Sequence, residues 1–210
     1  MPSRLKLLAG FLAVAAVAVA VGVAVWLLVI DNGGGATAAP RPADGHYQNA
    51  NMRYSFDYPT DWQDVTDLIT FSVPKEAQVL DRVAVGVVDK DTGVFRGAQV
   101  TVVKLNRKVK ESDLDQELSN LDDLFKQQAA AVKGKLDPPK PAELGGLKAR
   151  QYLLQFAFTS TQVVFDVASS QVVTFFGDKQ YTVNCQGASA DYNKTVVPGC
   201  EQLLQSFRFH

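Results

Sequence analysis

Two histidines, His46 and His210, are the first residues to examine for catalysis, because histidine is the usual general base near neutral pH. His46 follows a stretch rich in Gly, Ala and Pro, and His210 is the final residue of the sequence. Neither position favours a side chain held rigidly against a Ser or Cys nucleophile. The sequence therefore predicts no Ser-His-Asp or Cys-His site, and we expect a protein that is not an enzyme.

Acidic residues supply two further candidates for chemistry. Asp89-Lys-Asp-Thr-Gly93 is similar to the start of a calcium loop, but Val94 and Val100 occupy the sixth and twelfth positions, where an EF-hand needs Gly and Glu. The acids between 113 and 123 open a predicted helix, whose N-terminus favours acids in any case. We expect no metal ion and no cofactor. A pair of carboxylates in a hydrolase stays open as an alternative.

Cys185 and Cys200 are the two cysteines of the chain. Their spacing fits neither a zinc site nor a Cys-x-x-Cys redox motif. An even number of cysteines beyond a membrane segment predicts a disulfide, because exported domains meet oxidising conditions. Closing this loop would stabilise the fold by about 3 kcal/mol in the chain-entropy description. Two free buried thiols are the alternative.

The segment from Leu7 to Ile30 contains no charged side chain. As a helix it would reach about 36 Å, enough to cross a hydrocarbon core of about 30 Å. Arg4 and Lys6 precede it, which directs the N-terminus to the cytoplasm. We therefore expect residues 1–30 to be a cytoplasmic stub and a single-pass anchor in the cell membrane. Signal-peptidase cleavage near Ala38 is the alternative, although a removable signal has a shorter apolar region of about 7–15 residues.

Residues 31–46 are dominated by Gly, Ala and Pro and predict a flexible tether. Residues 47–210 are sufficient for one extracytoplasmic domain. The formal net charge of the whole chain is −1. Such a balance gives no basic surface for nucleic acid or for anionic lipid, so we expect no nucleic-acid partner.

Alternation of apolar and polar residues predicts a series of strands in this domain. Short polar links join the later strands, which requires antiparallel pairing. The predicted strands are 54–58, 69–73, 82–88, 98–105, 147–158, 162–168, 171–176 and 180–185, with a last short strand near 207–209. The fold class expected is α+β, an antiparallel sheet flanked by helices and preceded by one transmembrane helix.

The clearest predicted helix spans 112–133. Ser112 is a suitable N-cap, and Gly134 marks the end. Apolar residues recur at steps of three and four along one face: Leu114, Leu118, Leu121, Phe125, Ala129 and Val132. We expect this face to pack on the sheet. A shorter helix is predicted near 198–205, with Cys200 on its apolar face.

Three short motifs carry a family resemblance: Phe56-Asp-Tyr-Pro-Thr-Asp-Trp62, Tyr181-Thr-Val-Asn-Cys185 and Ser206-Phe-Arg-Phe209. With the order of elements, they make residues 47–210 similar to the PsbP-like fold and to the LpqN/LpqT lipoproteins of actinobacterial cell envelopes. This chain has no lipidation cysteine near its apolar segment, and a transmembrane anchor takes its place. The resemblance implies a non-catalytic accessory module and transfers no site residue.

The function expected is therefore an anchored accessory or binding module of a membrane or cell-envelope complex. Tyr58 and Trp62 are the candidate interface residues, with a place in the core as the alternative for Trp62. A carrier of lipid or another small ligand is a second hypothesis, and it requires a cavity between sheet and helix. A carboxylate-dependent envelope hydrolase is the third.

Overall fold

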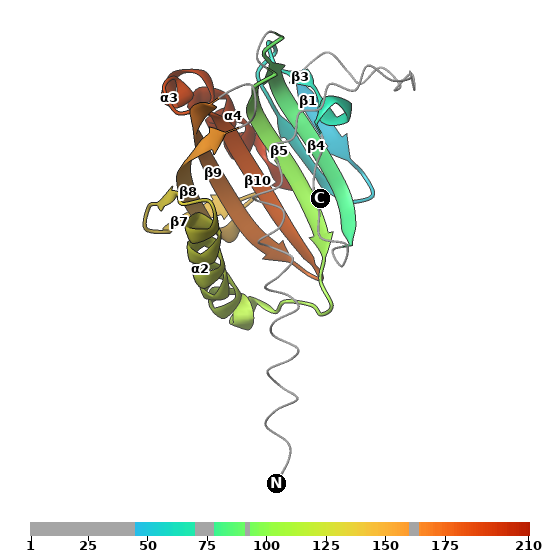
Figure 1. Cartoon of the computed structure of the whole chain (residues 1–210). Coiled ribbons are helices and arrows are strands. Elements are labelled where there is room, and N and C mark those ends of the chain that lie inside the picture. The colour runs from blue at the N-terminus through green and yellow to red at the C-terminus, as the bar shows by residue number, and fades with distance from the viewer. Residues whose placement is uncertain (1–44, 70–77, 91–92, 160–163) are drawn as a thin grey trace.

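The computed structural model describes residues 45–69, 78–90, 93–159 and 164–210. Within these ranges the chain forms a large antiparallel sheet with helices on both of its faces and a small second sheet beside it (Figure 1). Every pair of strands in the described ranges is antiparallel. The predicted α+β class with an antiparallel sheet is thus confirmed.

The large sheet has the strand order β3-β4-β5-β10-β9-β8-β6, with β7 pairing to β8. Its strands are β3 (Gln63–Asp64), β4 (Val79–Val88), β5 (Phe95–Lys104), β6 (Lys135–Leu136), β7 (Lys140–Leu144), β8 (Leu147–Thr159), β9 (Val164–Phe176) and β10 (Lys179–Ala188). The long strands β5, β10 and β9 form its centre. A short 3₁₀ helix, η1 (Thr66–Leu68), follows β3.

One face of the large sheet is apolar. The small sheet, β1 (His46–Asn49), β2 (Tyr54–Asp57) and β11 (Arg208–Phe209), packs on this side together with α3 (Tyr192–Thr195) and α4 (Val197–Ser206). The resulting main core joins residues from all these layers, among them Val100, Val183, Leu203 and Phe207. The layers on this side therefore follow in the order large sheet, main core, and then α4 lying beside the small sheet.

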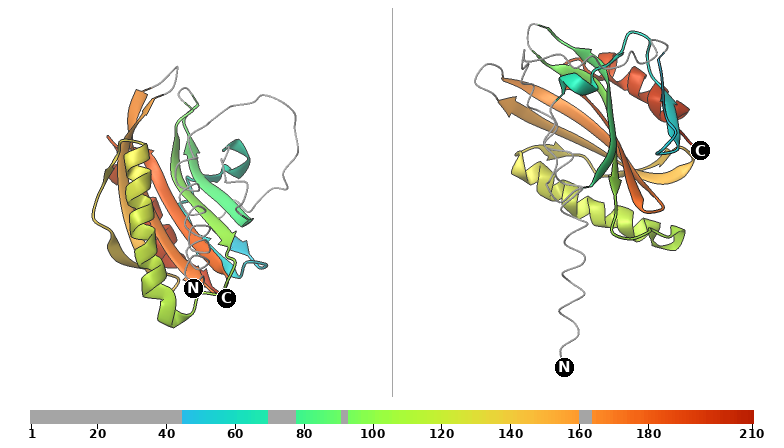
Figure 2. Two further views of the ribbon diagram at one scale, coloured as in Figure 1. Left: turned by 60° about the horizontal axis from the view of Figure 1, so that its bottom comes forward. Right: turned by 90° about the vertical axis from the view of Figure 1, so that its right-hand side faces the viewer.

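The opposite face carries α2 (Leu114–Ala131), which follows the 3₁₀ turn η2 (Glu111–Asp113). The right-hand view of Figure 2 shows α2 and α4 on opposite sides of the sheet. Leu118, Leu121 and Phe125 are buried against Tyr152 and other residues of β8 and β9, so the predicted packing of this helix on a sheet is confirmed.

Both predicted ends of this helix need correction. The N-cap position is Asp113 rather than Ser112, because the 3₁₀ turn occupies Glu111–Asp113 and no side chain caps the helix by a hydrogen bond. At the other end Lys133 adopts a φ of 52°, the left-handed conformation that ends many helices. The amide of Gly134 then bonds to the carbonyl of Ala129 at 2.8 Å. The helix therefore ends at Ala131, and Lys133 rather than the predicted Gly134 takes the left-handed position after it.

The two strands predicted at 162–168 and 171–176 are a single strand, β9. Ser169 and Ser170 lie inside it, because both faces of the sheet at this point contain polar partners for a hydroxyl. The Pro-rich connector after α2 also contributes β7, which forms a hairpin with β8 through Gly145 and Gly146. Both glycines have positive φ, as a two-residue hairpin turn requires.

The predicted anchor from Leu7 to Ile30, residues 31–44 of the predicted tether and most of the predicted strand at 69–73 lie outside the described residues. The last tether residue, His46, instead opens β1. Among the helices within the described ranges, none combines the length and the apolar character needed to cross a membrane. The anchor therefore stays a prediction from the sequence.

Candidate functional site

The face of the large sheet that carries α2 also bears a set of uncharged polar side chains over its central strands. We call this set the polar layer. Its members are Gln99 and Thr101 on β5, Ser169 and Gln171 on β9, and Gln180, Thr182, Asn184 and Gln186 on β10. Each of them is buried. The centre of this face is thus polar, although its side chains are withdrawn from solvent.

Strand register places these residues in rows. Asn184 lies opposite Gln99 on β5 and opposite Gln171 on β9, so three carboxamides stand side by side across three strands. In the next row Gln186 lies opposite Ser169. Because side chains alternate between the faces of a strand, residues paired in this way share one face. The rows therefore form one continuous surface.

Only part of this surface is satisfied by its own hydrogen bonds. Ser169 donates to Oδ1 of Asn184 at 2.8 Å, and Nδ2 of Asn184 donates to Oε1 of Gln186 at 2.9 Å. The Nε2 atoms of Gln99, Gln171 and Gln186 are buried and have no hydrogen-bond partner in the described structure. A buried donor without a partner costs free energy, typically about 1–3 kcal/mol. These amide groups therefore stand out as unpaired.

A fourth glutamine, on α2, joins the same side of the sheet. Gln128 is 1% exposed, and its Nε2 also lacks a partner in the described part of the chain. It belongs to the helix face that packs on β8 and β9. Figure 1 shows α2 lying over β8 and β9 and not over β10 and β5.

Two apolar clusters lie on either side of the polar layer. One joins α2 to the sheet through residues such as Phe125 and Tyr152, whose rings stack at a centroid distance of 3.7 Å. The other joins Val65 and Ile69 beside η1 to Ala84 and Phe95 on β4 and β5. The polar layer is thus a strip between two apolar walls.

The charged groups nearest this strip are engaged in structural contacts. Tyr152 donates to Asp122 at 2.9 Å, and Asp122 is also 3.4 Å from Arg150. Burial raises the pKa of Tyr152 well above its usual range, and the bond to Asp122 adds to the rise. Glu117, a buried carboxylate on α2, pairs with Arg107. These contacts fasten α2 to its surroundings.

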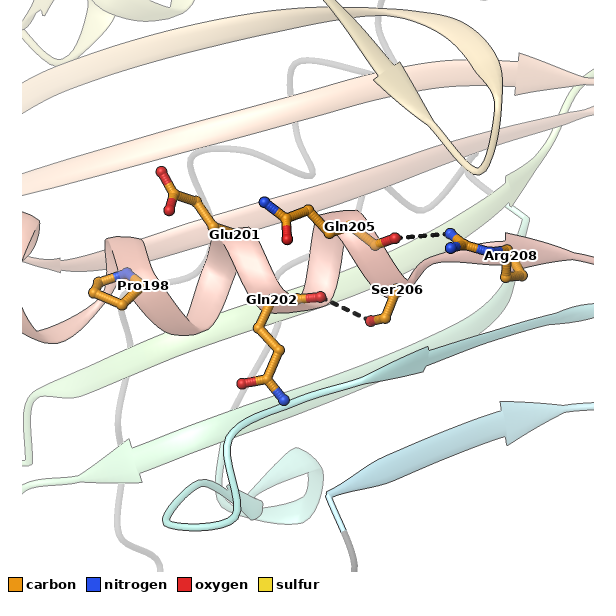
Figure 3. A pocket seen from close by; sticks show the side chains of 6 residues that line it. All are labelled: Pro198, Glu201, Gln202, Gln205, Ser206 and Arg208. Carbon is orange, nitrogen blue, oxygen red and sulfur yellow. Dashed lines mark hydrogen bonds between the residues drawn. The ribbon is translucent and has the colours of Figure 1, made fainter.

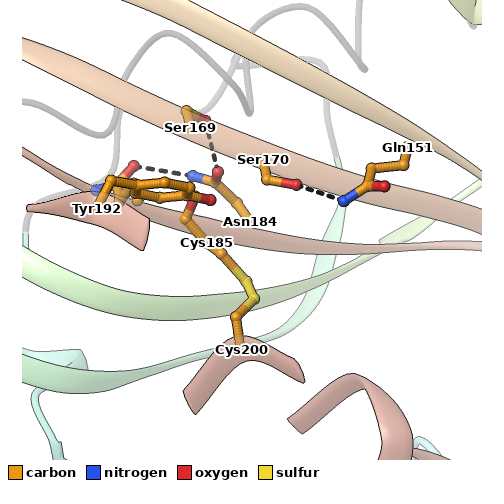
Figure 4. The surroundings of a disulfide bond; sticks show 8 residues. Gln151, Ser169, Ser170, Asn184, Cys185, Tyr192 and Cys200 are labelled. Atoms are coloured by element: carbon orange, nitrogen blue, oxygen red, sulfur yellow. Dashed lines mark hydrogen bonds between the residues drawn. A yellow bond between two sulfur atoms is a disulfide. The ribbon is translucent and has the colours of Figure 1, made fainter. Parts of the chain in front are cut away.

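The opposite face of β10 holds the disulfide. Cys185 on β10 and Cys200 on α4 are bonded, with their Cα atoms 6.2 Å apart, so the predicted bridge is confirmed (Figure 4). Tyr192 lies beside it and donates its hydroxyl to the carbonyl of Cys185 at 3.2 Å. Burial raises the pKa of Tyr192 to about 12. Gln151 on this face is satisfied, because its Nε2 donates to Ser170 at 2.9 Å.

Tyr58 and Trp62, the interface candidates from the sequence, are each 6% exposed and belong to the main core. A Cβ added at Gly199 of α4 would lie 2.5 Å from Cζ2 of Trp62, so this ring packs directly against the helix. Trp62 therefore lies in the core, which is the alternative that the sequence analysis left open for it. The exposure that an interface role for these two rings requires is absent from the structure.

Both histidines lie at the small sheet. Nδ1 of His46 is 2.6 Å from Oδ1 of Asp57, and both side chains are exposed. Nε2 of His210 is 2.9 Å from Oγ of Ser55. In the described residues no group of three or more His, Cys, Asp or Glu side chains is arranged to hold a metal ion. The histidine contacts tie the small sheet together. His210 lies against a serine hydroxyl, which its place at the end of the sequence did not predict.

A surface hollow of about 500 Å³ lies along the outer side of α4 (Figure 3). Its lining comes from exposed or half-exposed residues of the helix and from Arg208, which donates to the carbonyl of Gln205 at 2.8 Å. Glu201 is the carboxylate in this lining. The hollow is open to solvent and does not lie between α4 and the sheet. It is therefore not the enclosed cavity that a lipid carrier requires.

Comparison with known proteins gives a fold and no residue roles. Neither protein-family models nor curated protein sequences match this chain. Among solved structures, the chain is similar to PsbP of the cyanobacterium Synechocystis sp. PCC 6803, with a TM-score of 0.48, 16% identity, and coverage of 84% of this chain and 98% of that one.

Two further structures are similar. LpqN of Mycobacterium tuberculosis, described as involved in cell envelope biogenesis, gives a TM-score of 0.42 at 10% identity and covers 74% of this chain and 82% of its own. A Bacteroides thetaiotaomicron protein gives 0.46 at 12% identity over 80% of this chain, which spans about half (49%) of that protein. The resemblance to PsbP and LpqN expected from the sequence is confirmed, as a likeness of fold.

The polar layer was not anticipated from the sequence. The sequence signal for it lies in three strands in which apolar and polar residues alternate. The polar positions are 99 and 101, 169 and 171, and the even positions from 180 to 186. In one strand alone this pattern is typical of a solvent-facing side. Only the register that aligns three such strands shows that their carboxamides form one buried surface.

Proposed function

We propose that this protein is a non-catalytic binding module, anchored in a membrane and serving a membrane or cell-envelope complex on the extracytoplasmic side. The observation that carries the proposal is the polar layer, in which the Nε2 atoms of Gln99, Gln171 and Gln186 have no partner among the described residues. A carboxamide donates and accepts hydrogen bonds but does not titrate near neutral pH. Groups of this kind suit recognition and are poor agents of proton transfer.

The contacts of the ionisable side chains support the same proposal. His46, His210, Asp122 and Glu117 each contact a partner that holds part of the fold in place. General acid–base catalysis needs a group that is free to exchange a proton with substrate. The named groups serve instead as links between elements.

Two features support an extracytoplasmic location for the domain. The predicted anchor from Leu7 to Ile30 has the length and charge pattern of a single-pass segment with a cytoplasmic N-terminus. The disulfide between Cys185 and Cys200 is typical of an oxidising compartment outside the cytoplasm. Both features favour a domain displayed on the outer side of the membrane.

Mild cross-linking in native membranes, followed by purification of the full chain, tests the proposal. We expect recovery of a discrete partner complex. A matched variant in which another apolar helix replaces Leu7 to Ile30 should recover the same complex, because the domain rather than the anchor makes the contact. Recovery of the full chain only as an unpartnered monomer would contradict the proposal.

A further inference from the structure

We propose that one end of the domain rests on the anionic phospholipid surface of a bilayer. This inference goes beyond the proposed function, because it concerns a contact of the domain itself with lipid and requires no partner complex. The surface lies where β5 and β9 end and β10 begins, at the lower end of the sheet in Figure 1. We call it the basic edge, and its members are Arg53, Lys104, Lys108, Phe176, Lys179 and Phe209.

Strand register gathers the first part of the basic edge. Lys179 of β10 lies opposite Lys104 of β5 and opposite Phe176 of β9, so these three side chains share one face of the sheet at its end. Phe209 of β11 lies beside them, because the centroid of its ring is 5.2 Å from that of Phe176. Two aromatic rings and two lysines therefore occupy one place.

The loop after β5 brings a further cation to this end. The amide of Leu105 donates to the carbonyl of Asp178 at 2.7 Å, and the amide of Val109 donates to the carbonyl of Gly177 at 2.8 Å. Lys108 lies between these two contacts in the sequence. The loop is thus fastened along the turn between β9 and β10, and it contains cations and no acid from residue 104 to residue 110.

The turn between β1 and β2 adds Arg53. The amide of His210 donates to the carbonyl of Arg53 at 2.9 Å, which joins this turn to the strand that bears Phe209. The hydroxyl of Tyr181, near the start of β10, donates to the carbonyl of Met52 at 3.2 Å. Segments from four parts of the chain therefore meet at the basic edge.

The cations of this edge are largely available to an anionic surface. Arg53, Lys104 and Lys108 are exposed, and none of them forms an ion pair within the described ranges. Lys179 is 3.2 Å from Asp178, the acid in the turn beside it. The formal net charge of −1, from which no surface for anionic lipid was expected, averages over this local excess of positive charge.

The opposite end of the sheet lacks this combination. Val164, at the other end of β9, is 70% exposed, and Phe176 is 45% exposed. The 13 residues of β9 separate the two positions by about 40 Å. The hairpin that bears Val164 contains no charged side chain from residue 151 to residue 165. Cations beside an exposed aromatic ring therefore distinguish the end at Phe176.

Cations with an exposed phenylalanine suit the surface of an anionic bilayer. A Lys or Arg near such a surface contributes about 1 kcal/mol, which corresponds to about fivefold in binding, and Phe enters the boundary between headgroups and acyl chains. A bilayer contacts a broad surface and needs no cavity. The hollow described above lies elsewhere, along α4. Contact with lipid headgroups therefore fits the shape of this end as well as its charge.

The proposed attachment to the membrane keeps the domain within reach of the bilayer. The predicted anchor ends at Ile30, and the described domain begins at Gly45. A flexible link of this length spans about 20 Å on average, about half the length of β9. Such a link gives the domain a high effective concentration at the surface, so that a few weak contacts are sufficient to orient it.

Photo-crosslinking of the full chain in reconstituted bilayers tests the inference. The probe replaces one exposed side chain at either end of β9, in the variants Phe176→p-benzoylphenylalanine and Val164→p-benzoylphenylalanine. The bilayers consist of phosphatidylcholine, alone or with about 30% phosphatidylglycerol as the anionic lipid. In the anionic bilayer we expect at least five times more lipid adduct from position 176 than from position 164, as measured by mass spectrometry. The adduct at position 176 should decrease in phosphatidylcholine alone and in about 1 M salt, which screens charges beyond about 3 Å.

Substitution of the cations links the adduct to the basic edge. Lys104→Gln/Lys108→Gln should lower the lipid adduct at position 176 at least fivefold in the anionic bilayer. The matched control is Lys90→Gln/Lys194→Gln, which removes two exposed cations outside the basic edge and should leave the adduct unchanged. A thermal unfolding curve for each variant shows whether the domain is intact.

Any of three results would overturn the inference. The first is equal lipid adduct from positions 176 and 164 in the anionic bilayer. The second is an adduct at position 176 that responds neither to phosphatidylglycerol nor to the loss of Lys104 and Lys108. The third is a probe at position 176 that reacts with a protein and not with lipid in native membranes. The third result would support the accessory role while excluding the lipid contact, so the two proposals fail separately.

Discussion

The two faces of the large sheet are built from the same strands and differ in how completely their groups are satisfied. On the face toward α4, Val100, Val172 and Val183 lie in adjacent strands within one apolar core. On the other face lie Gln99 and Gln171, which directly precede Val100 and Val172 in their strands. Their amide nitrogens have no partners in the described chain. One face is satisfied by apolar packing, whereas the other leaves hydrogen-bond donors without partners in the described chain.

Strand β9 shows the contrast within a single residue step. Val172 faces the main core, while Gln171 faces the polar layer, and both are about 2% exposed. Equal burial therefore has opposite consequences: burying a valine side chain is favourable, and burying an unpaired amide is costly.

The largest effect is expected from truncating the apolar face. Phe207 is fully buried between α4 and the small sheet and stacks on Tyr54 at a centroid distance of 5.3 Å. Phe207→Ala should lower the free energy of unfolding by about 3–5 kcal/mol, because it removes buried area and leaves a cavity. Chemical denaturation measures the change.

Phe176→Ala is the matched control, since this ring is 45% exposed on the rim of the sheet. We expect less than half the loss seen at Phe207. Equal losses at the two positions would show that the main core is not the principal source of stability.

The disulfide should have the next largest effect. The double variant Cys185→Ala/Cys200→Ala opens a loop with a sequence separation of 15 residues and should lower the free energy of unfolding by about 3 kcal/mol. The bridge lies on the apolar face of the sheet, where it joins β10 to α4. Thermal unfolding of the oxidised wild type, the reduced wild type and the double variant measures the effect. An unchanged midpoint on reduction would rule out a stabilising role for the bridge.

A pH dependence is expected from Tyr192, whose pKa burial raises to about 12 from an ordinary value of about 10. Below pH 10 the phenol is protonated in both the folded and the unfolded chain, so its contribution is fully present. Between about pH 10 and 12 the unfolded chain loses the proton first, and stability falls by about 2–3 kcal/mol as pH rises.

Tyr192→Phe should flatten this part of the curve when the midpoint of urea unfolding is followed from pH 8 to 12. Part of the slope should persist, because burial raises the pKa of Tyr181 likewise to about 12 and also raises the pKa values of Tyr47, Tyr54 and Tyr152. An identical slope in the wild type and the variant would mean that Tyr192 ionises equally in both states.

Features that depend on local pattern could be predicted from the sequence. The apolar stripe on α2 specifies both the helix and its packing side, because residues at steps of three and four share one face. Short links between strands require antiparallel pairing, and the two cysteines allow one intramolecular bridge. These inferences need no knowledge of long-range register.

Features that depend on long-range contacts could not be predicted in this way. Ser169 and Ser170 look like a turn in isolation, and they remain in a strand because Asn184 and Gln151 bond to them from neighbouring strands. Tyr58 and Trp62 are interface candidates in the sequence, with the core as the alternative for Trp62. The choice depends on α4, more than a hundred residues later in the chain, which covers Trp62. The polar layer likewise appears only when three strands are aligned.

The smallest effect, with the opposite sign, is expected on the face toward α2. Gln127 and Gln128 are neighbours on this helix, but Gln127 is exposed and Gln128 is 1% exposed with an unpaired Nε2 in the described structure. Gln128→Leu removes the unpaired amide and extends the apolar cluster around Phe125. It should raise the free energy of unfolding by about 1 kcal/mol in the ligand-free chain.

Gln127→Leu is the matched control, because it makes the same chemical change in solvent and should alter stability by less than about 0.5 kcal/mol. Urea unfolding of the two variants beside the wild type measures the difference. A clear loss of stability in Gln128→Leu would mean that the wild-type amide is satisfied after all. The contrast between the two faces would then disappear at α2 and would rest on the donors of Gln99, Gln171 and Gln186.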